Sequence, residues 1–268
     1  MKSSKQSCLI SLCLFLHTIF LLAIIPIVFV TFLNVFKHTQ SDTNKEAAEL
    51  VTKSFVFIEI INEERTKTCF GDTCGESTDN RVMYTASGVA IAENQVLTAG
   101  HVCQSFEEVS LLFKKEPTKN EYESMTIETQ TVIWLIAKDS LGNRLSTRIL
   151  KIDDQSDLCI LDAPGITKEL SIKISKTGPL QGDHVLTAAA PLGIFSKGMT
   201  LVFDGLYAGS TDDSDVYAMP CRHGSSGAPI VNEDGELVAL TYAGSEDIEN
   251  VNIATNLVRI RGFLHLDK

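Results

Sequence analysis

The run CRHGSSGAP, at residues 221–229, contains a serine in a glycine-rich turn. A serine hydroxyl is a weak nucleophile until a base accepts its proton and backbone N–H groups stabilise the carbonyl oxygen under attack. Gly224 and Gly227 permit a tight turn that exposes the Ser226 hydroxyl in this way. The same residues also suit an ordinary turn between strands. The run by itself therefore leaves two interpretations open.

Two further runs supply the groups that an activated serine needs. The run VLTAGHVC, at residues 96–103, is a short apolar strand that leads into His101. The run DLCIL, at residues 157–161, places Asp157 at the start of another apolar strand. A histidine that accepts the serine proton and an acid that orients the histidine complete this chemistry. The three groups follow one another along the chain in the order His, Asp, Ser.

In this order the three runs resemble the trypsin-like, chymotrypsin-fold serine peptidases, and among them the bacterial HtrA-type and glutamyl-endopeptidase-like branch. The resemblance covers residues 54–264. It implies that His101 accepts the proton of Ser226, that Asp157 orients the imidazole, and that the N–H groups of Gly224 and Ser226 form an oxyanion hole. It also implies a serine endopeptidase that cuts polypeptides through an acyl-enzyme intermediate, without a cofactor or a metal ion.

Other histidines and acids compete for the two supporting roles. The remaining histidines are His17, His38, His184, His223 and His265, and the acids near Asp157 are Asp153, Asp154 and Asp162. His101 is the expected base because it follows a strand end, as triad geometry requires. Asp157 is the expected acid because it opens the apolar strand, whereas its neighbours have the character of solvated turn charges.

The substrate pocket is predicted from the resemblance. Pro220 lies six residues before Ser226, where relatives that cut after lysine or arginine carry an acid. Thr241 stands where glutamyl-specific relatives carry a histidine. The sequence therefore predicts a preference for a small or medium apolar residue. The expected lining comprises Pro220, His223, Thr241 and Tyr242.

Other classes of protein fit the sequence less well. A catalytically inactive relative that binds extended peptides by strand addition remains the alternative. An esterase of the α/β-hydrolase type would need the order Ser, Asp, His and a nucleophile elbow. A formal net charge of −11, without a cluster of Lys and Arg, argues against a nucleic-acid partner. Oligomeric state does not follow from the sequence.

The N-terminal region predicts a membrane anchor. Residues 9–36 are almost continuously apolar, and no charged residue occurs between Lys5 and Lys37. This length suffices for a hydrocarbon core of roughly 30 Å. No small-residue cleavage site follows it, although a cleaved signal peptide is the alternative. We expect a tail at 1–8, a transmembrane helix at 9–36 and a polar tether at 37–50, with one helical turn at 45–49.

The flanking charges favour a cytoplasmic tail, which would place the rest of the chain on the extracytoplasmic side, periplasmic or extracellular. The cysteines agree with that side, because Cys69 and Cys74 enclose four residues and could form a small disulfide loop. Cys103, Cys159 and Cys221 have no predicted partner. Cys159 is expected to be a small buried residue of an apolar strand.

Beyond residue 50, short β-type runs alternate with turn residues, so the fold class is all-β. The resemblance implies a peptidase domain at 51–268 with two six-stranded antiparallel β-barrels, at about 54–163 and 180–256. A C-terminal helix is expected over 256–266. No segment remains for a PDZ domain, which most HtrA relatives carry.

Overall fold

The computed structural model describes residues 44–70, 72–104, 118–119, 125–211, 213–245 and 247–266. The chain divides into two compact units, Met1–Lys45 and Glu46–Lys268. The predicted tail at 1–8 and transmembrane helix at 9–36 lie outside the described residues. In the part of the chain that is described, no helix combines the length and apolar character needed to cross a membrane.

A helix occupies residues 44–54, where the sequence predicted a polar tether with one helical turn. Ala47 and Val51 are four residues apart, so they share one helical face, and both are buried in the main core. Ser54 ends the helix with its hydroxyl bonded to the carbonyl of Leu50 at 3.0 Å. The last part of the predicted tether therefore belongs to the folded unit.

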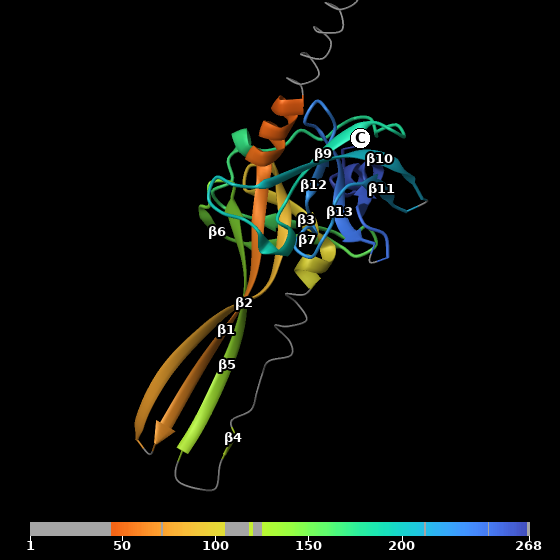
Figure 1. The fold of residues 1–268 in the computed structure, drawn as a ribbon. Helices are drawn as coiled ribbons and strands as arrows, with labels where there is room; N and C mark the ends of the chain where they lie inside the picture. Colours follow the sequence, from red (N-terminus) through yellow and green to blue (C-terminus); the bar gives the residue numbers. More distant parts are fainter. Residues whose placement is uncertain are drawn as a thin grey trace, which may run out of the picture. The chain divides into compact units, whose positions relative to one another are not determined.

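The first half of the folded unit is an eight-stranded antiparallel sheet (Figure 1). Its order is β4-β5-β1-β2-β3-β8-β7, with β6 paired to β5. The strands are β1 (Phe55–Phe70), β2 (Thr73–Ala92), β3 (Gln95–Ala99), β4 (Thr118–Lys119), β5 (Met125–Asp139), β6 (Arg144–Ser146), β7 (Arg148–Asp153) and β8 (Leu158–Asp162).

The prediction of a six-stranded barrel in this half was wrong. β6 pairs with β5, and β7, which begins after Thr147, pairs with β8. The chain therefore changes partners at Thr147, and no ladder among the described strands closes the sheet. In addition, β1, β2 and β5 run on together as a three-stranded arm (Figure 1). Residues 73–82 of this arm are all exposed. A disulfide between Cys69 and Cys74 joins β1 to β2 at its tip.

The second half is a closed six-stranded barrel, as predicted, in the order β10-β11-β14-β13-β12-β9. Its strands are β9 (His184–Ala189), β10 (Leu201–Ser210), β11 (Asp215–Ala218), β12 (Pro229–Val231), β13 (Leu237–Gly244) and β14 (Val251–Asn256). The short helical turns η1 (Lys168–Leu170) and η2 (Pro191–Gly193) lie in the connections. The predicted C-terminal helix is present as α3 (Leu257–Phe263), and Asn256 caps it by accepting from the backbone N–H of Arg259.

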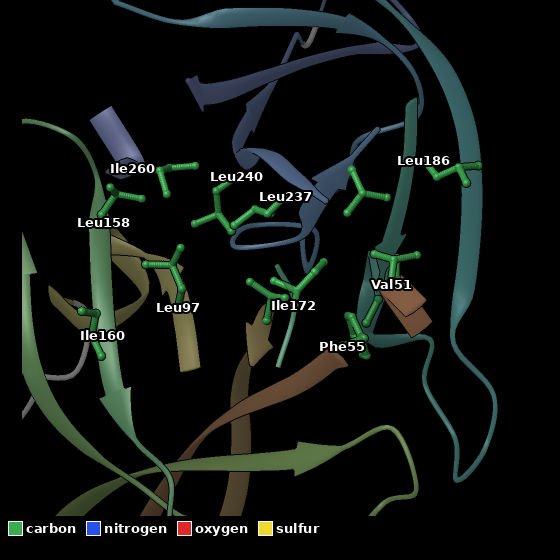
Figure 2. Close-up of a cluster of buried hydrophobic side chains, with 14 of the residues drawn as sticks. Val51, Phe55, Leu97, Leu158, Ile160, Ile172, Leu186, Leu237, Leu240 and Ile260 are labelled. Carbon is green, nitrogen blue, oxygen red and sulfur yellow. The ribbon is translucent and has the colours of Figure 1, made fainter. Parts of the chain in front are cut away.

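One hydrophobic core joins the two halves (Figure 2). Leu97 and Leu158 enter it from the first sheet, Leu240 from the barrel and Ile260 from α3, and none is more than 1 % exposed. Burial of one such side chain contributes about 1.5–3 kcal/mol. Because β3 leads to His101 and β8 follows Asp157, this shared core fixes the position of both residues relative to the serine loop of the barrel.

Candidate active site

The histidine and the acid contact each other at two points. Asp157 Oδ1 accepts a hydrogen bond from the backbone N–H of His101 at 2.7 Å, and Asp157 Oδ2 lies 2.8 Å from His101 Nδ1. A carboxylate only accepts, so Nδ1 carries the proton in this pair and Nε2 is left as the basic nitrogen. The arrangement gives His101 the tautomer that a general base for serine requires.

The competing acids have other partners. Asp153 accepts from the backbone N–H of Gln155 at 3.1 Å, and Asp154 accepts from the side chain of Gln104 at 2.7 Å. Asp162 forms an ion pair with Arg148 at 2.7 Å. Of the four acids considered from the sequence, the structure brings only Asp157 to His101.

The serine loop is held between the two halves. The Ser226 carbonyl accepts from the N–H of Ser87 in β2 at 2.8 Å, and the Gly227 N–H donates to the Thr241 carbonyl in β13 at 2.7 Å. The Ser87 hydroxyl donates to the Gly224 carbonyl at 2.8 Å. The segment around Ser226 is therefore fixed by hydrogen bonds to both β2 and β13.

The turn before Ser226 orients two amide groups. Ser225 N–H donates to the Arg222 carbonyl at 2.9 Å, and Gly224 has φ +93°, which fits a type II turn with glycine at its third position. A Cβ at Gly224 would also collide with the Ala190 carbonyl. Glycine is thus required here by both the backbone angle and the space.

A contact from η2 fixes the peptide group between His223 and Gly224. The His223 carbonyl accepts from the Leu192 N–H at 2.6 Å. Because C=O and N–H of a trans peptide point in opposite directions, the Gly224 N–H faces away from Leu192. Among the described residues, the N–H groups of Gly224 and Ser226 donate to no other protein group. Both are therefore available for the oxygen of a bound carbonyl.

A cavity of about 480 Å³ brings the chemistry-bearing residues together. It is lined by Ile60, Met83, Tyr84, Thr85, Ala86, His101, Val102, Leu192, His223, Gly224 and Ser226. His101, Ser226 and Gly224 thus line one cavity together with several apolar side chains. A substrate carbonyl in this cavity would have the nucleophile and the base at its side.

Only one of the four predicted pocket residues, His223, lines this cavity. Thr241 is fully buried and accepts from the Asn252 side chain at 3.0 Å, while the Tyr242 hydroxyl lies 2.8 Å from the Ser214 hydroxyl. Pro220 is not part of the lining either.

Sequence reasoning missed the apolar lining from β1, β2 and η2. The run Pro191-Leu192-Gly193 was an available signal, because it forms η2 and Leu192 lines the cavity.

A second disulfide, between Cys103 and Cys159, ties the histidine to the acid. The sequence predicted no partner for either cysteine, and this expectation was wrong, whereas Cys159 is buried in an apolar strand, as predicted. Cys103 lies two residues after His101 on the helical turn at 100–104, and Cys159 lies two residues after Asp157 on β8. The covalent bond therefore joins the two segments that carry the interacting pair.

Loss of this disulfide is expected to destabilise the folded unit strongly. The two cysteines are 56 residues apart, and closing a loop of that size restricts the unfolded chain by about 4 kcal/mol in the loop-entropy description. The double variant Cys103→Ser, Cys159→Ser should therefore lose about that much free energy of unfolding in urea titrations. Cys69→Ser with Cys74→Ser is the matched control, because it opens a small loop at the exposed tip of the arm. Equal losses in both variants would contradict this assignment.

A buried acid far from the triad has a different role. Asp215 in β11 is 6 % exposed, and it accepts from the hydroxyls of Tyr207 and Tyr217 at 3.3 Å each. Burial raises the pKa of its carboxyl above the ordinary 3.8, against the lowering effect of the two hydroxyls. A raised acid pKa means that the folded state disfavours the charged form.

Asp215→Asn is therefore expected to stabilise the protein at neutral pH. At a pH below the ordinary pKa of 3.8, the Asp215 carboxyl is protonated in both the folded and the unfolded protein, so its ionisation does not affect stability. As pH rises through the folded-state pKa, the wild-type chain must ionise a buried group and loses stability, whereas the variant does not. Thermal melts from pH 3 to pH 8 should show a difference that grows with pH. Asp204→Asn, at an exposed position of β10, should show no such trend, and a pH-independent difference for Asp215→Asn would refute the mechanism.

The fold and this cavity are those of a serine hydrolase with a chymotrypsin-like fold. A family model described as a trypsin-like peptidase domain matches residues 86–240. The chain therefore belongs to the trypsin-like peptidases and is a serine peptidase, which implies polypeptide substrates. A search of curated proteins found no match.

Solved structures of bacterial proteases share the fold. The active form of the Rv3671c protease from M. tuberculosis aligns with a TM-score of 0.56 and 12% identity over 82% of each chain. Its inactive form aligns with a TM-score of 0.56 and 12% identity over 84% of this chain and 93% of that one. The serine endoprotease from Yersinia pestis aligns with a TM-score of 0.58 and 17% identity, over 83% of this chain and 65% of that one.

Proposed function

We propose that this serine peptidase is an endopeptidase that hydrolyses peptide bonds through His101, Asp157 and Ser226 and an acyl-enzyme intermediate. The observation that carries the proposal is the two-point contact between Asp157 and His101, at the rim of a cavity that Ser226 and Gly224 also line. This contact supports one defined role for each of the three groups.

In the first half-reaction, Ser226 Oγ attacks the carbonyl carbon of the substrate while His101 Nε2 accepts the hydroxyl proton. The carbonyl oxygen becomes negatively charged and accepts from the N–H groups of Gly224 and Ser226. One such donor is worth about 3–4 kcal/mol in comparable sites. His101 then gives its proton to the leaving nitrogen, the C–N bond breaks, and the acyl group remains on Ser226.

In the second half-reaction, water takes the place of the leaving amine. His101 accepts a proton from the water as its oxygen attacks the acyl carbon, and then returns a proton to Ser226 Oγ as the ester bond breaks. Asp157 stays ionised throughout and stabilises the imidazolium that forms in each half. The products are a free carboxylate and a regenerated enzyme.

The cavity supports a preference for apolar substrate residues of small or medium size. Ile60, Met83, Val102 and Leu192 contribute apolar surface, and the residues of its lining include no acid that would attract lysine or arginine. A library of peptides that varies the residue before the cut site would test this preference. Efficient cutting after basic residues would contradict it.

The proposal extends to a single-pass membrane protein with its peptidase domain on the extracytoplasmic side. The apolar run at 9–36 supports the anchor, and the two disulfides support an oxidising compartment. After expression in a bacterial host, the full chain should stay with the membrane fraction after a carbonate wash. Its peptidase domain should become sensitive to added protease when the outer membrane of the host is permeabilised. Recovery in the soluble fraction would refute the anchor.

Labelling of the full chain with a fluorophosphonate probe tests the catalytic proposal directly. An activated serine attacks the probe at phosphorus, and peptide mass spectrometry then locates the adduct. We expect an adduct on Ser226 that is absent from Ser226→Ala. A folded protein that takes no label would instead favour the inactive relative that binds extended peptides.

A further inference from the structure

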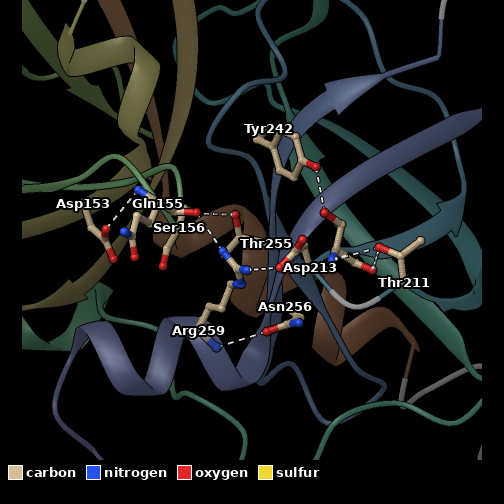
Figure 3. Close-up of polar contacts among 10 residues, drawn as sticks. Asp153, Gln155, Ser156, Thr211, Asp213, Tyr242, Thr255, Asn256 and Arg259 are labelled. Carbon is tan, nitrogen blue, oxygen red and sulfur yellow. Dashed lines mark hydrogen bonds and ion pairs between the residues drawn. The ribbon is translucent and has the colours of Figure 1, made fainter.

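The loop that carries Asp157 is held by two residues from the C-terminal end of the chain (Figure 3). Arg259 Nη1 donates to the Gln155 carbonyl at 2.7 Å, and the Thr255 hydroxyl donates to the Ser156 carbonyl at 2.8 Å. Thr255 is buried at the end of β14, and Arg259 lies in the first turn of α3. Neither residue lines the substrate cavity.

These two carbonyls lie where they control the backbone of Asp157. The Ser156 carbonyl belongs to the peptide group that joins Ser156 to Asp157. Rotation of this peptide group about the N–Cα bond of Asp157 is the φ angle of that residue. That angle is +49°, in the left-handed region that residues other than glycine seldom adopt. Such a conformation costs about 1–3 kcal/mol and persists where surrounding contacts enforce it. The Thr255 hydroxyl supplies one such contact directly.

Arg259 is itself fixed from two further sides. Its Nη2 forms an ion pair with Asp213 in the turn between β10 and β11, and its backbone N–H donates to the Asn256 side chain at 3.0 Å. The guanidinium is planar, so pairing one nitrogen with Asp213 also orients the other nitrogen toward Gln155. The barrel and α3 thereby hold a loop of the first sheet in place (Figure 3).

We propose that Thr255 and Arg259 are positioning residues for catalysis: they hold the loop at 155–157 so that the Asp157 carboxylate meets His101 at both of its contact points. The inference rests on the proposed function, because it needs Asp157 to act on His101. The residues touch neither substrate nor reacting atoms. Their removal therefore affects turnover through the geometry of Asp157 and leaves substrate binding unchanged.

The test compares paired variants of the full chain on one peptide substrate. Thr255→Val removes the hydroxyl at nearly constant shape, and Arg259→Gln removes the charge and the planar fork. Small displacements of catalytic groups can cost about 10²-fold, so we expect each variant to lower kcat by about 10- to 100-fold with KM unchanged. Thr255→Ser, which keeps the hydroxyl, should restore kcat to within about twofold of wild type. Arg148→Gln is the matched control, because Arg148 pairs with Asp162 at the far end of the same hairpin.

A second measurement separates positioning from a general loss of structure. In an Asp157→Asn background the carboxylate is already gone, so Thr255→Val and Arg259→Gln should lower the residual kcat by less than about twofold. Equal losses in both backgrounds would overturn the proposal, as would wild-type kcat in the double variant Thr255→Val, Arg259→Gln. Activity of Ser226→Ala close to that of the wild type would instead refute the proposed function itself. Urea midpoints of all variants show which losses come from unfolding.

Discussion

Ser226→Ala is expected to lower kcat by about 10⁶-fold, and His101→Ala by itself by nearly as much. The double variant should lose little more than either single one. Without the serine there is no nucleophile for the base to activate, and without the base the serine hydroxyl keeps its proton. The two side chains therefore act as a unit, although their segments are more than a hundred residues apart in the chain. Cleavage of one peptide substrate by the three variants, with His184→Ala as an exposed control, measures this directly.

Additive losses in the double variant would contradict the triad assignment, because they would show that Ser226 and His101 contribute to catalysis independently. A second adverse result would be a large loss in His184→Ala, since His184 is exposed at the start of β9 and lies outside the cavity lining. Residual activity is expected in every variant. The backbone donors at Gly224 and at the nucleophile position remain, and in comparable enzymes such groups still accelerate hydrolysis by about 10³–10⁴-fold over water.

The sequence predicts the local parts of this site well, because those parts depend on short-range patterns. The buried strand β3 ends two residues before His101, and β8 begins directly after Asp157; both are visible in the sequence as the short runs VLTA and LCIL. The C-terminal helix was predicted over 256–266 from the resemblance, and in the structure Asn256 caps α3 while Leu257, Ile260 and Phe263 form its buried face.

Features that depend on contacts between distant segments were missed. Residues 73–82 of the arm are exposed and mostly polar, and they form a strand because β2 pairs with β1 along the whole length of β1, while β5 pairs with the other edge of β1. The sheet of the first half stays open because the chain changes partners at Thr147, and no local pattern shows that change. The bond between Cys103 and Cys159 depends on the approach of β3 to β8, and cysteine spacing carries no information about that approach.

The substrate cavity is the least predictable part for the same reason. Its walls come from β1, β2, η2 and the serine loop, so that a residue such as Leu192 becomes part of the site only through the fold. Conversely, Thr241 lies close to the nucleophile in space through its backbone, while its side chain is buried against Asn252. Position along the chain located the strand correctly but not the direction of its side chain.

Asp157→Asn is expected to lower kcat by about 10⁴-fold while the protein stays folded. The carboxylate accepts at both oxygens, from the backbone N–H of His101 and from its Nδ1. Asparagine has one accepting oxygen and a donating NH₂ group, so it satisfies the backbone N–H only by presenting NH₂ to Nδ1. Nδ1 must then accept, and the imidazole proton moves to Nε2. That nitrogen can no longer take the proton of Ser226.

Steady-state cleavage by Asp157→Asn measures the expected loss of kcat, and circular dichroism of the same variant shows whether it stays folded. The shape of the side chain is preserved, and the contact with the backbone N–H of His101 survives, so the thermal midpoint should change far less than turnover does. Asp154→Asn is the matched control, because Asp154 bonds Gln104 and does not touch His101. If Asp157→Asn kept full turnover and Asp154→Asn lost it, the orienting role would belong to the neighbouring acid. That result would contradict the triad assignment, because the tautomer of His101 would then be set by a group other than the carboxylate that accepts from its Nδ1.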